Sequence, residues 1–180
     1  MLVKEIIDLY EILDSAYASG AKVAEFLKNI RPDCKVSVET IQGKKGKTTD
    51  VVKVLIPGKN GKTKGGTAPT IGLLGRLGGL GARPERIGFV SDGDGALTVL
   101  AAAAKLLKMQ NEGDELDGDV IISTHVCPDA PTQPHKPVAF MDSPVSMKQI
   151  NQSEVDTSAD AILSVDTTKG NRIMNHKGFA

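Results

Sequence analysis

Apolar residues recur with a different period in the two parts of the chain, and the change falls near residue 70. Before it, apolar residues in 3–13 and 21–30 return every three or four positions, which predicts two amphipathic helices. The apolar face of the first helix comprises Val3, Ile6, Ile7, Tyr10 and Leu13. Apolar and polar residues then alternate in 36–40, and 51–56 is a second apolar run, so we expect a two-stranded hairpin over Val36–Ile56.

After residue 70, short and nearly continuous apolar runs predominate, as they do in strands that are buried on both faces of a sheet. Such runs predict strands over 70–74, 87–90, 119–124 and 161–165, of which the first is expected to be central and the last buried. The segment 97–108 predicts a buried helix, 147–152 a short helix, and 171–176 a final, more polar strand. This order predicts one α/β domain over 1–180, with three αβα layers and a mixed, largely parallel sheet.

Composition and charge narrow the classes of function. The hydrophobic fraction is 40%, with no Trp and only 3% aromatic residues, so the core is aliphatic, which argues against a β-sandwich. Basic and acidic residues number 22 each, so the chain lacks the positive field that non-specific nucleic-acid binding requires. The Lys- and Gly-rich segment 44–64 is a local exception, which we interpret as a solvated hairpin rather than a phosphate-binding patch.

Cysteine usage and the N-terminus indicate a cytoplasmic protein. Cys34 and Cys127 are too few for a disulfide framework and suit a reducing compartment. The first residues place acids within an apolar stretch and offer no small-residue cleavage site, so they do not predict a signal peptide. No apolar run approaches the roughly 20 residues of a membrane helix. We therefore expect no membrane partner.

Two acids separated by glycine, Asp92 and Asp94, follow the predicted strand 87–90 and precede the long helix. Open α/β sheets bind ligands at the carboxyl ends of their strands, and carboxylates there are suited to divalent cations. The alternative is helix capping, in which an aspartate stabilises the helix start by about 1 kcal/mol without a catalytic role. We favour metal ligation for Asp92 and capping for Asp94.

Polar residues also mark the ends of the next two strands. His125, Cys127 and Asp129 alternate, so an extended strand would place three ligand-capable side chains on one face, an arrangement that a zinc or iron site can use. The alternative is a buried Cys acting as a small apolar residue and a His satisfied by the backbone. Asp166 follows strand 161–165 directly. Arg76, in a glycine-rich connector, has the bidentate fork that binds a carboxylate or phosphate.

The order of these segments resembles the catalytic domain of the co-catalytic zinc aminopeptidases and deacylases, the clan of succinyl-diaminopimelate desuccinylase, aminoacylase and glutamate carboxypeptidase. Four segments carry the resemblance: 92–97 is similar to the bridging-aspartate segment, 118–122 to the next strand, 161–166 to the strand that ends in an acidic ligand, and 171–178 to the strand before the lid domain. Asp129 falls where the clan has its acidic pair with the general base. More closely, 75–131 is similar to an uncharacterised bacterial and archaeal family of unknown function.

The sequence departs from the clan at three points. Arg76 and the two residues after it stand where the clan has its His-x-Asp ligand motif, so the first metal histidine is missing. Asp129 is followed by alanine instead of a second acid. The lid domain and last metal histidine would lie beyond Ala180, so we expect a longer chain or a second chain to complete the fold. His125, Cys127 and His135 are the candidates to replace the lost ligand.

Two functional hypotheses follow, with a vestigial assembly subunit as a third. In the first, the chain is a metal-dependent hydrolase of amide or peptide bonds. Asp92, His125 and Asp166 would bind a divalent metal, zinc in the resembled clan, and Asp129 would be the catalytic base. Arg76 would contact a small-molecule or peptide substrate. In the second, a non-catalytic relative binds an anionic metabolite or amino acid in the same cleft. We expect no nucleic-acid partner, and either a homo-oligomer or a second chain.

Overall fold

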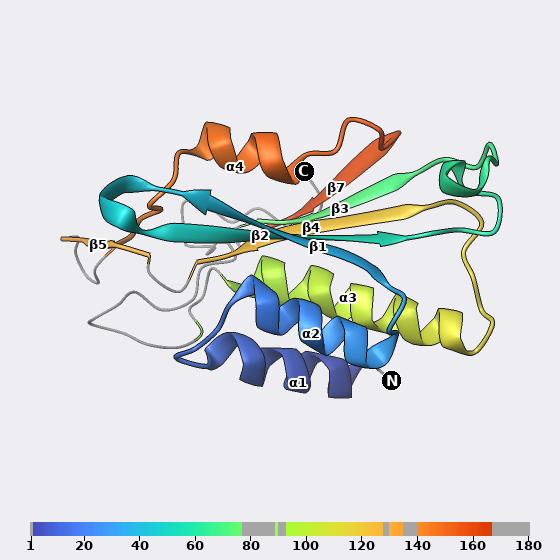
Figure 1. Ribbon diagram of the computed structural model, residues 1–180, viewed down its shortest axis with the longest axis horizontal. Helices are drawn as coiled ribbons and strands as arrows, with labels where there is room; N and C mark the ends of the chain where they lie inside the picture. Colours follow the sequence, from blue (N-terminus) through green and yellow to red (C-terminus); the bar gives the residue numbers. More distant parts are fainter. Residues whose placement is uncertain (1, 77–88, 90–92, 128–129, 135–139, 167–180) are drawn as a thin grey trace, which may run out of the picture.

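The computed structural model describes residues 2–76, 89, 93–127, 130–134 and 140–166. A five-stranded sheet in the order β1-β2-β4-β3-β7 forms its centre (Figure 1). The strands are β1 (Lys35–Gln42), β2 (Thr48–Ile56), β3 (Ile71–Gly75), β4 (Val120–Val126) and β7 (Ala161–Val165). β1, β2 and β4 pair antiparallel, whereas β4, β3 and β7 pair parallel. The sheet is therefore mixed, as the sequence predicted.

Helices cover both faces of this sheet, so the molecule has three layers (Figure 1). The larger helical layer consists of α1 (Val3–Asp14), α2 (Gly20–Ile30) and α3 (Asp94–Asn111), and the opposite face carries α4 (Met147–Glu154). Smaller elements are the 3₁₀ turns η1 (Lys44–Gly46) and η2 (Lys62–Lys64), and a separate ribbon of β5 (Thr132–Gln133) and β6 (Phe140–Met141). None of the helices in the described part of the chain has the length and apolarity that a bilayer crossing requires.

The apolar core lies between the sheet and the larger helical layer. Alternation along β2 and β4 directs Val52, Val54 and Ile122 towards α1, α2 and α3, where all three are fully buried. Leu100 in the middle of α3 packs into the same cluster. The small side chains of α3 let the helix approach the sheet closely, which explains why an alanine-rich segment forms the central helix.

The start of α3 touches the carboxyl ends of two strands because two glycines leave room for it. A side chain at Gly95 would lie 2.3 Å from the Arg76 carbonyl oxygen and 2.6 Å from that of Val165. A side chain at Gly75 would lie 2.6 Å from the Gly95 carbonyl oxygen. Any larger residue at either position would separate the helix from the sheet. The packing fixes the first turn of α3 against the ends of β3 and β7.

The structure corrects the face that the first helix buries. The helix forms as predicted, but α1 buries Leu9, Leu13 and Glu5 against its neighbours. Val3 and Ile7, which the predicted apolar face included, are each 55% exposed. The glutamate is buried because its Oε1 accepts a hydrogen bond from Lys108 Nζ of α3 at 2.6 Å. This ion pair joins α1 to a residue 103 positions away, and apolar spacing within the helix could not reveal it.

The structure also corrects the predicted burial of segment 161–165. This strand exists, but β7 lies at one edge of the sheet and its residues are mostly exposed, with Leu163 at 58%. β1, at the other edge, is likewise mostly exposed. β3 lies inside the sheet between β4 and β7, with β4 as the middle strand, and Ile71 at the start of β3 is 41% exposed. The predicted strands 87–90 and 171–176 lie outside the described residues, apart from Phe89.

Candidate active site at the carboxyl ends of the parallel strands

Arg76 and Asp166 directly follow two neighbouring parallel strands at the same edge of the sheet. Arg76 directly follows β3, and its N–H donates to the Val165 carbonyl oxygen at 2.8 Å. Asp166 is the next residue after β7 and is exposed. Asp94 lies in the first turn of α3, with Gly93 at the N-cap position, so the acid favours the helix dipole without being the cap itself. This edge is where open α/β sheets place their ligand sites.

His125, on the face of β4 that α4 covers, forms a buried pair with a carboxylate. Its Nδ1 lies 2.5 Å from Oε1 of Glu154, the last residue of α4. The two residues are 7% and 1% exposed, so the pair is almost closed to water. A buried carboxylate requires hydrogen-bond partners, and the histidine provides one. The contact leaves Nε2 as the ring nitrogen that can bind a metal ion.

The second oxygen of Glu154 holds Arg76. Arg76 Nη1 donates to Glu154 Oε2 at 2.9 Å, and Nη2 donates to Asn151 Oδ1 at 2.6 Å and contacts Met147 Sδ at 3.7 Å. The arginine is therefore clamped by three residues of α4. Glu154 joins the end of β3 to the end of β4 through one carboxylate, and this fixes both side chains relative to each other.

The local sequence explains why α4 is in place to make these contacts. Ser146 caps the helix by accepting from the Gln149 N–H, and the Gln149 side chain accepts in return from the Ser146 N–H, which completes a capping box. Ile150 lies one turn before Glu154 on the same side of the helix, and both are 1% exposed. The apolar contact of Ile150 thus seats the helix, and Glu154 follows it into the interior.

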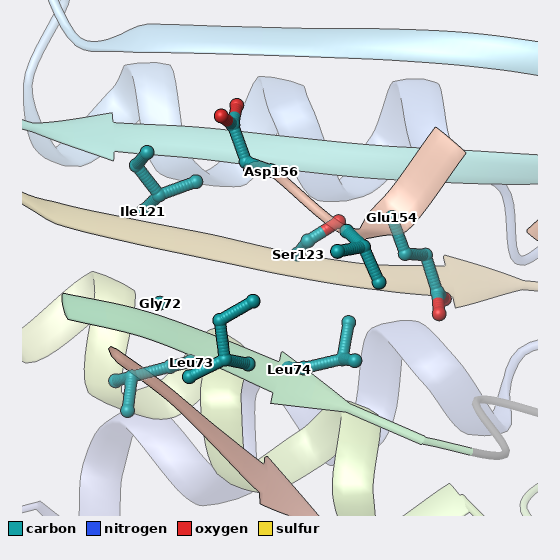
Figure 2. Close-up of a pocket in the computed structure, with 9 residues that line it drawn as sticks. Gly72, Leu73, Leu74, Ile121, Ser123, Glu154 and Asp156 are labelled. Carbon is teal, nitrogen blue, oxygen red and sulfur yellow. The ribbon is translucent and has the colours of Figure 1, made fainter. Parts of the chain in front are cut away.

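A small pocket lies between β3, β4 and the end of α4 (Figure 2). Its lining includes Leu74, Ser123 and Glu154, with Gly72 leaving space on β3. Figure 2 shows Ser123 on β4 between Ile121 and the Glu154 side chain. The Ser123 hydroxyl is buried, and within the described residues it has no hydrogen-bond partner. The polar network beside His125 therefore includes one hydroxyl without a partner.

Of the predicted site residues, the structure describes Arg76, His125 and Asp166, whereas Asp92 and Asp129 lie outside the described residues. Arg76 and His125 are brought together through Glu154. In the part of the chain that the structure describes, no three His, Cys, Asp or Glu side chains gather closely enough to hold a metal ion. The Cys127 thiol is buried and donates to the Thr48 carbonyl oxygen at 3.7 Å.

Sequence reasoning missed Glu154 and Asn151, which make the central contacts. The sequence contained only an indirect indication that Glu154 is buried. A capping box begins at Ser146, and the helical spacing from Ile150 to Glu154 places an acid on the same side as an apolar residue. An acid on the apolar side of a helix requires a buried partner. That partner cannot be read from the helix alone.

Several solved structures are similar to this chain at low identity. The bottromycin maturation enzyme BotP in complex with Mn is 16% identical over 72% of this chain and 31% of its own, with a TM-score of 0.46. A mutant of tomato leucine aminopeptidase is 14% identical over 78% of this chain and 30% of its own, with a TM-score of 0.44. An Acidobacteriales bacterium glutaminyl cyclase is 19% identical over 66% and 40%, with a TM-score of 0.37.

This chain spans less than half the length of each of these proteins, and similarity at this level assigns no activity. No curated protein matches the sequence. One family model does match, over residues 39–180, which is most of the chain, and its description is "Protein of unknown function (DUF1177)". The chain belongs to this family, the DUF1177 proteins of unknown function.

Proposed function

We propose that this chain forms the catalytic core of a metal-dependent hydrolase of amide or peptide bonds, with a divergent metal site at the carboxyl ends of β3, β4 and β7. The supporting observation is the buried contact between His125 Nδ1 and Glu154 Oε1. Histidines that bind metal ions usually donate their other ring N–H to a carboxylate, which fixes the ring and raises its basicity. Glu154 has this relationship to His125.

The residue types that we propose as donors at this edge are ones that zinc binds. His125 would supply a nitrogen through Nε2, and Asp166 would supply a carboxylate from the end of β7. Asp92 and Asp129, which lie outside the described residues, remain the proposed second carboxylate ligand and the general base. A bound divalent ion would lower the pKa of water to about 7. Asp129 is the proposed general base, and Glu154 would hold the His125 ring in place.

The contacts of Arg76 with Glu154 and Asn151 support a second role, in which Arg76 holds these side chains in place in addition to contacting substrate. Its side chain is 21% exposed, so it is reachable from outside while bound to Glu154. A substrate carboxylate would have to share the guanidinium with Glu154 and Asn151. The same partial exposure favours the second candidate function, a non-catalytic protein that binds an anionic metabolite or amino acid at this edge through Arg76.

Metal content tests the first function. The native full-length protein, purified without chelators, is expected to carry zinc, manganese or cobalt by elemental analysis. His125→Ala should lose the metal, because it removes a ligand. Glu154→Gln should keep the ligand but weaken metal affinity by roughly 10- to 100-fold, because the ring loses its charged partner. Lys148→Ala, on the exposed side of α4, is the matched control and should retain the metal.

The outcomes separate the two functions. Equal metal content in His125→Ala and in the wild type would overturn the ligand assignment. If no metal is found, and a small carboxylate raises the melting temperature of the wild type but not of Arg76→Met, equally with and without EDTA, the anion-binding function is supported instead. Arg76→Met should abolish that thermal shift.

A further inference from the structure

A larger pocket lies on the same face of the sheet, towards the start of β4. Its volume is about 390 Å³, within the range of about 300–1,000 Å³ typical of small-molecule sites. Ile121 of β4 lies in its lining, four residues before His125 and therefore about 13 Å from it along the strand. Figure 2 shows Ile121 and Asp156 on the β2 side of β4, away from the Glu154 carboxylate. The pocket is thus separate from the proposed metal edge.

The strand register places two lysines beside an apolar floor. Lys35 of β1 is opposite Leu55 of β2, and Lys53 lies two residues before Leu55 on the same strand. The two lysines are therefore diagonal neighbours, with about 7–8 Å between positions on the same face. Leu55 and Ile121 are themselves paired between β2 and β4, and both line the pocket. Two ammonium groups accordingly flank one apolar surface.

The Asp156 carboxylate in the lining of this pocket already accepts hydrogen bonds from the protein. Asp156 accepts from the Ser158 hydroxyl at 2.7 Å, from the Ser158 N–H at 3.1 Å, and from Lys53 Nζ at 3.4 Å. The Ser158 hydroxyl and N–H, with a smaller contribution from the nearby Lys53, hold the pKa of Asp156 below its usual value. The Thr63 hydroxyl, also in the lining, donates to Asp119 at 2.8 Å. Asp156 therefore keeps its negative charge, but its hydrogen bonds to Ser158 and Lys53 hold it in place within the protein.

The donors, by contrast, remain available. Lys35 has no ion pair among the residues that the structure describes, and its side chain is exposed at the pocket. Lys53 makes one contact, to Asp156, and an ammonium group has three N–H donors. The lining carries two ammonium groups and one carboxylate, that of Asp156, so its net charge is positive. With its spare N–H donors and apolar floor, the pocket is complementary to an anion that carries an apolar group.

We propose that this pocket binds a small organic anion, a carboxylate or a phosphate monoester with a short apolar chain. The oxyanion lies between Lys35 and Lys53, and the apolar chain lies on Leu55 and Ile121. The site is independent of metal binding at the His125 edge, so it stands or fails separately from the proposed function.

Isothermal titration of the full-length protein with four probes tests the assignment. Hexanoate and hexyl phosphate should bind, hexylammonium should not, and inorganic phosphate should bind more weakly than hexyl phosphate because it lacks the apolar chain. Whichever of the first two binds more tightly identifies the headgroup. Lys35→Met and Lys53→Met should each weaken binding roughly tenfold or more, because each removes a charged hydrogen-bond donor.

Lys59→Met is the matched control, since it removes the same charge from an exposed turn outside the lining, and its affinity should equal that of the wild type. His125→Ala should also bind the anion with wild-type affinity. The proposal is overturned if neither hexyl anion binds with a Kd below about 10 mM. It is equally overturned if hexylammonium binds as tightly as hexanoate, or if Lys59→Met loses as much affinity as the two pocket variants.

Discussion

The two faces of the sheet bury different kinds of side chain. The face under α1, α2 and α3 buries a continuous apolar cluster that includes Leu27 and Leu100. The face under α4 buries Ser123, His125 and Glu154 within a few residues of one another. Apolar packing has no preferred direction, whereas each buried polar group needs a specific partner. The first face therefore supplies stability, and the second fixes the positions of side chains that can do chemistry.

The side chains of β4 alternate between these two faces of the sheet. All seven of its residues are buried, but Ile122 points into the apolar cluster while its neighbours Ile121 and Ser123 line the pockets below α4. Single substitutions along this strand can therefore separate the two faces. Substitutions at two places on this strand and at Asp119, directly before it, test the comparison in order of expected effect.

Ile122→Ala should have the largest effect, about 2–5 kcal/mol of unfolding free energy, because it leaves a cavity in a close-packed core. Ile121→Ala removes the same atoms one residue away on the opposite face. It should cost roughly half as much, because that side chain already borders a pocket. Urea denaturation of both variants measures the difference. Equal losses would mean that the two faces contribute alike to stability.

Asp119→Asn tests whether a satisfied polar group beside β4 is structural. Burial raises the pKa of Asp119, but hydrogen bonds from the Gly58 N–H, the Thr63 N–H and the Thr63 hydroxyl outweigh it and hold the pKa below its usual value. The residue is 1% exposed, so the substitution should cost about 1–3 kcal/mol at pH 7. Because the folded-state pKa is lowered, this stability is present above the unfolded pKa of about 4 and is lost as pH falls through the folded pKa.

Denaturation from pH 7 to pH 2 measures this dependence. The wild type and Asp119→Asn should converge at the acid end. The exposed Asp114→Asn is the control and should follow the wild type throughout. A difference between wild type and Asp119→Asn that does not change with pH would contradict the role of the charge.

Ser123→Ala should have the smallest effect and the opposite sign, stabilising the protein by up to about 1 kcal/mol. The hydroxyl is buried without a partner in the described residues, so its removal relieves a desolvation cost. Thr124→Val is the matched control one residue away, because its hydroxyl donates to the Gly75 carbonyl oxygen at 2.9 Å. That variant should lose about 1 kcal/mol. If Ser123→Ala is as destabilising as Thr124→Val, the hydroxyl has a partner in solution.

The bounds of these local elements could be predicted from the sequence to within a few residues. The predicted hairpin over 36–56 is β1 and β2, and the predicted helix 97–108 is the longer α3. Segment 119–124 is β4, and 147–152 lies within α4. These predictions agree with the structure because the helix and strand periods are set by residues only a few positions apart. The role of Asp166, and those of Asp92 and Asp129 outside the described residues, stay predictions.

The sequence by itself determined the class of fold and pointed to strand ends where polar side chains gather. Only the tertiary structure decided which face each element buries and which side chains meet. Glu154 contacts His125 across 29 positions and Arg76 across 78, and Glu5 meets Lys108 across 103. Such pairs depend on how strands are ordered and helices are seated. Local periodicity carries no information about partners so distant, and the buried charges of this protein are stabilised by partners of that kind.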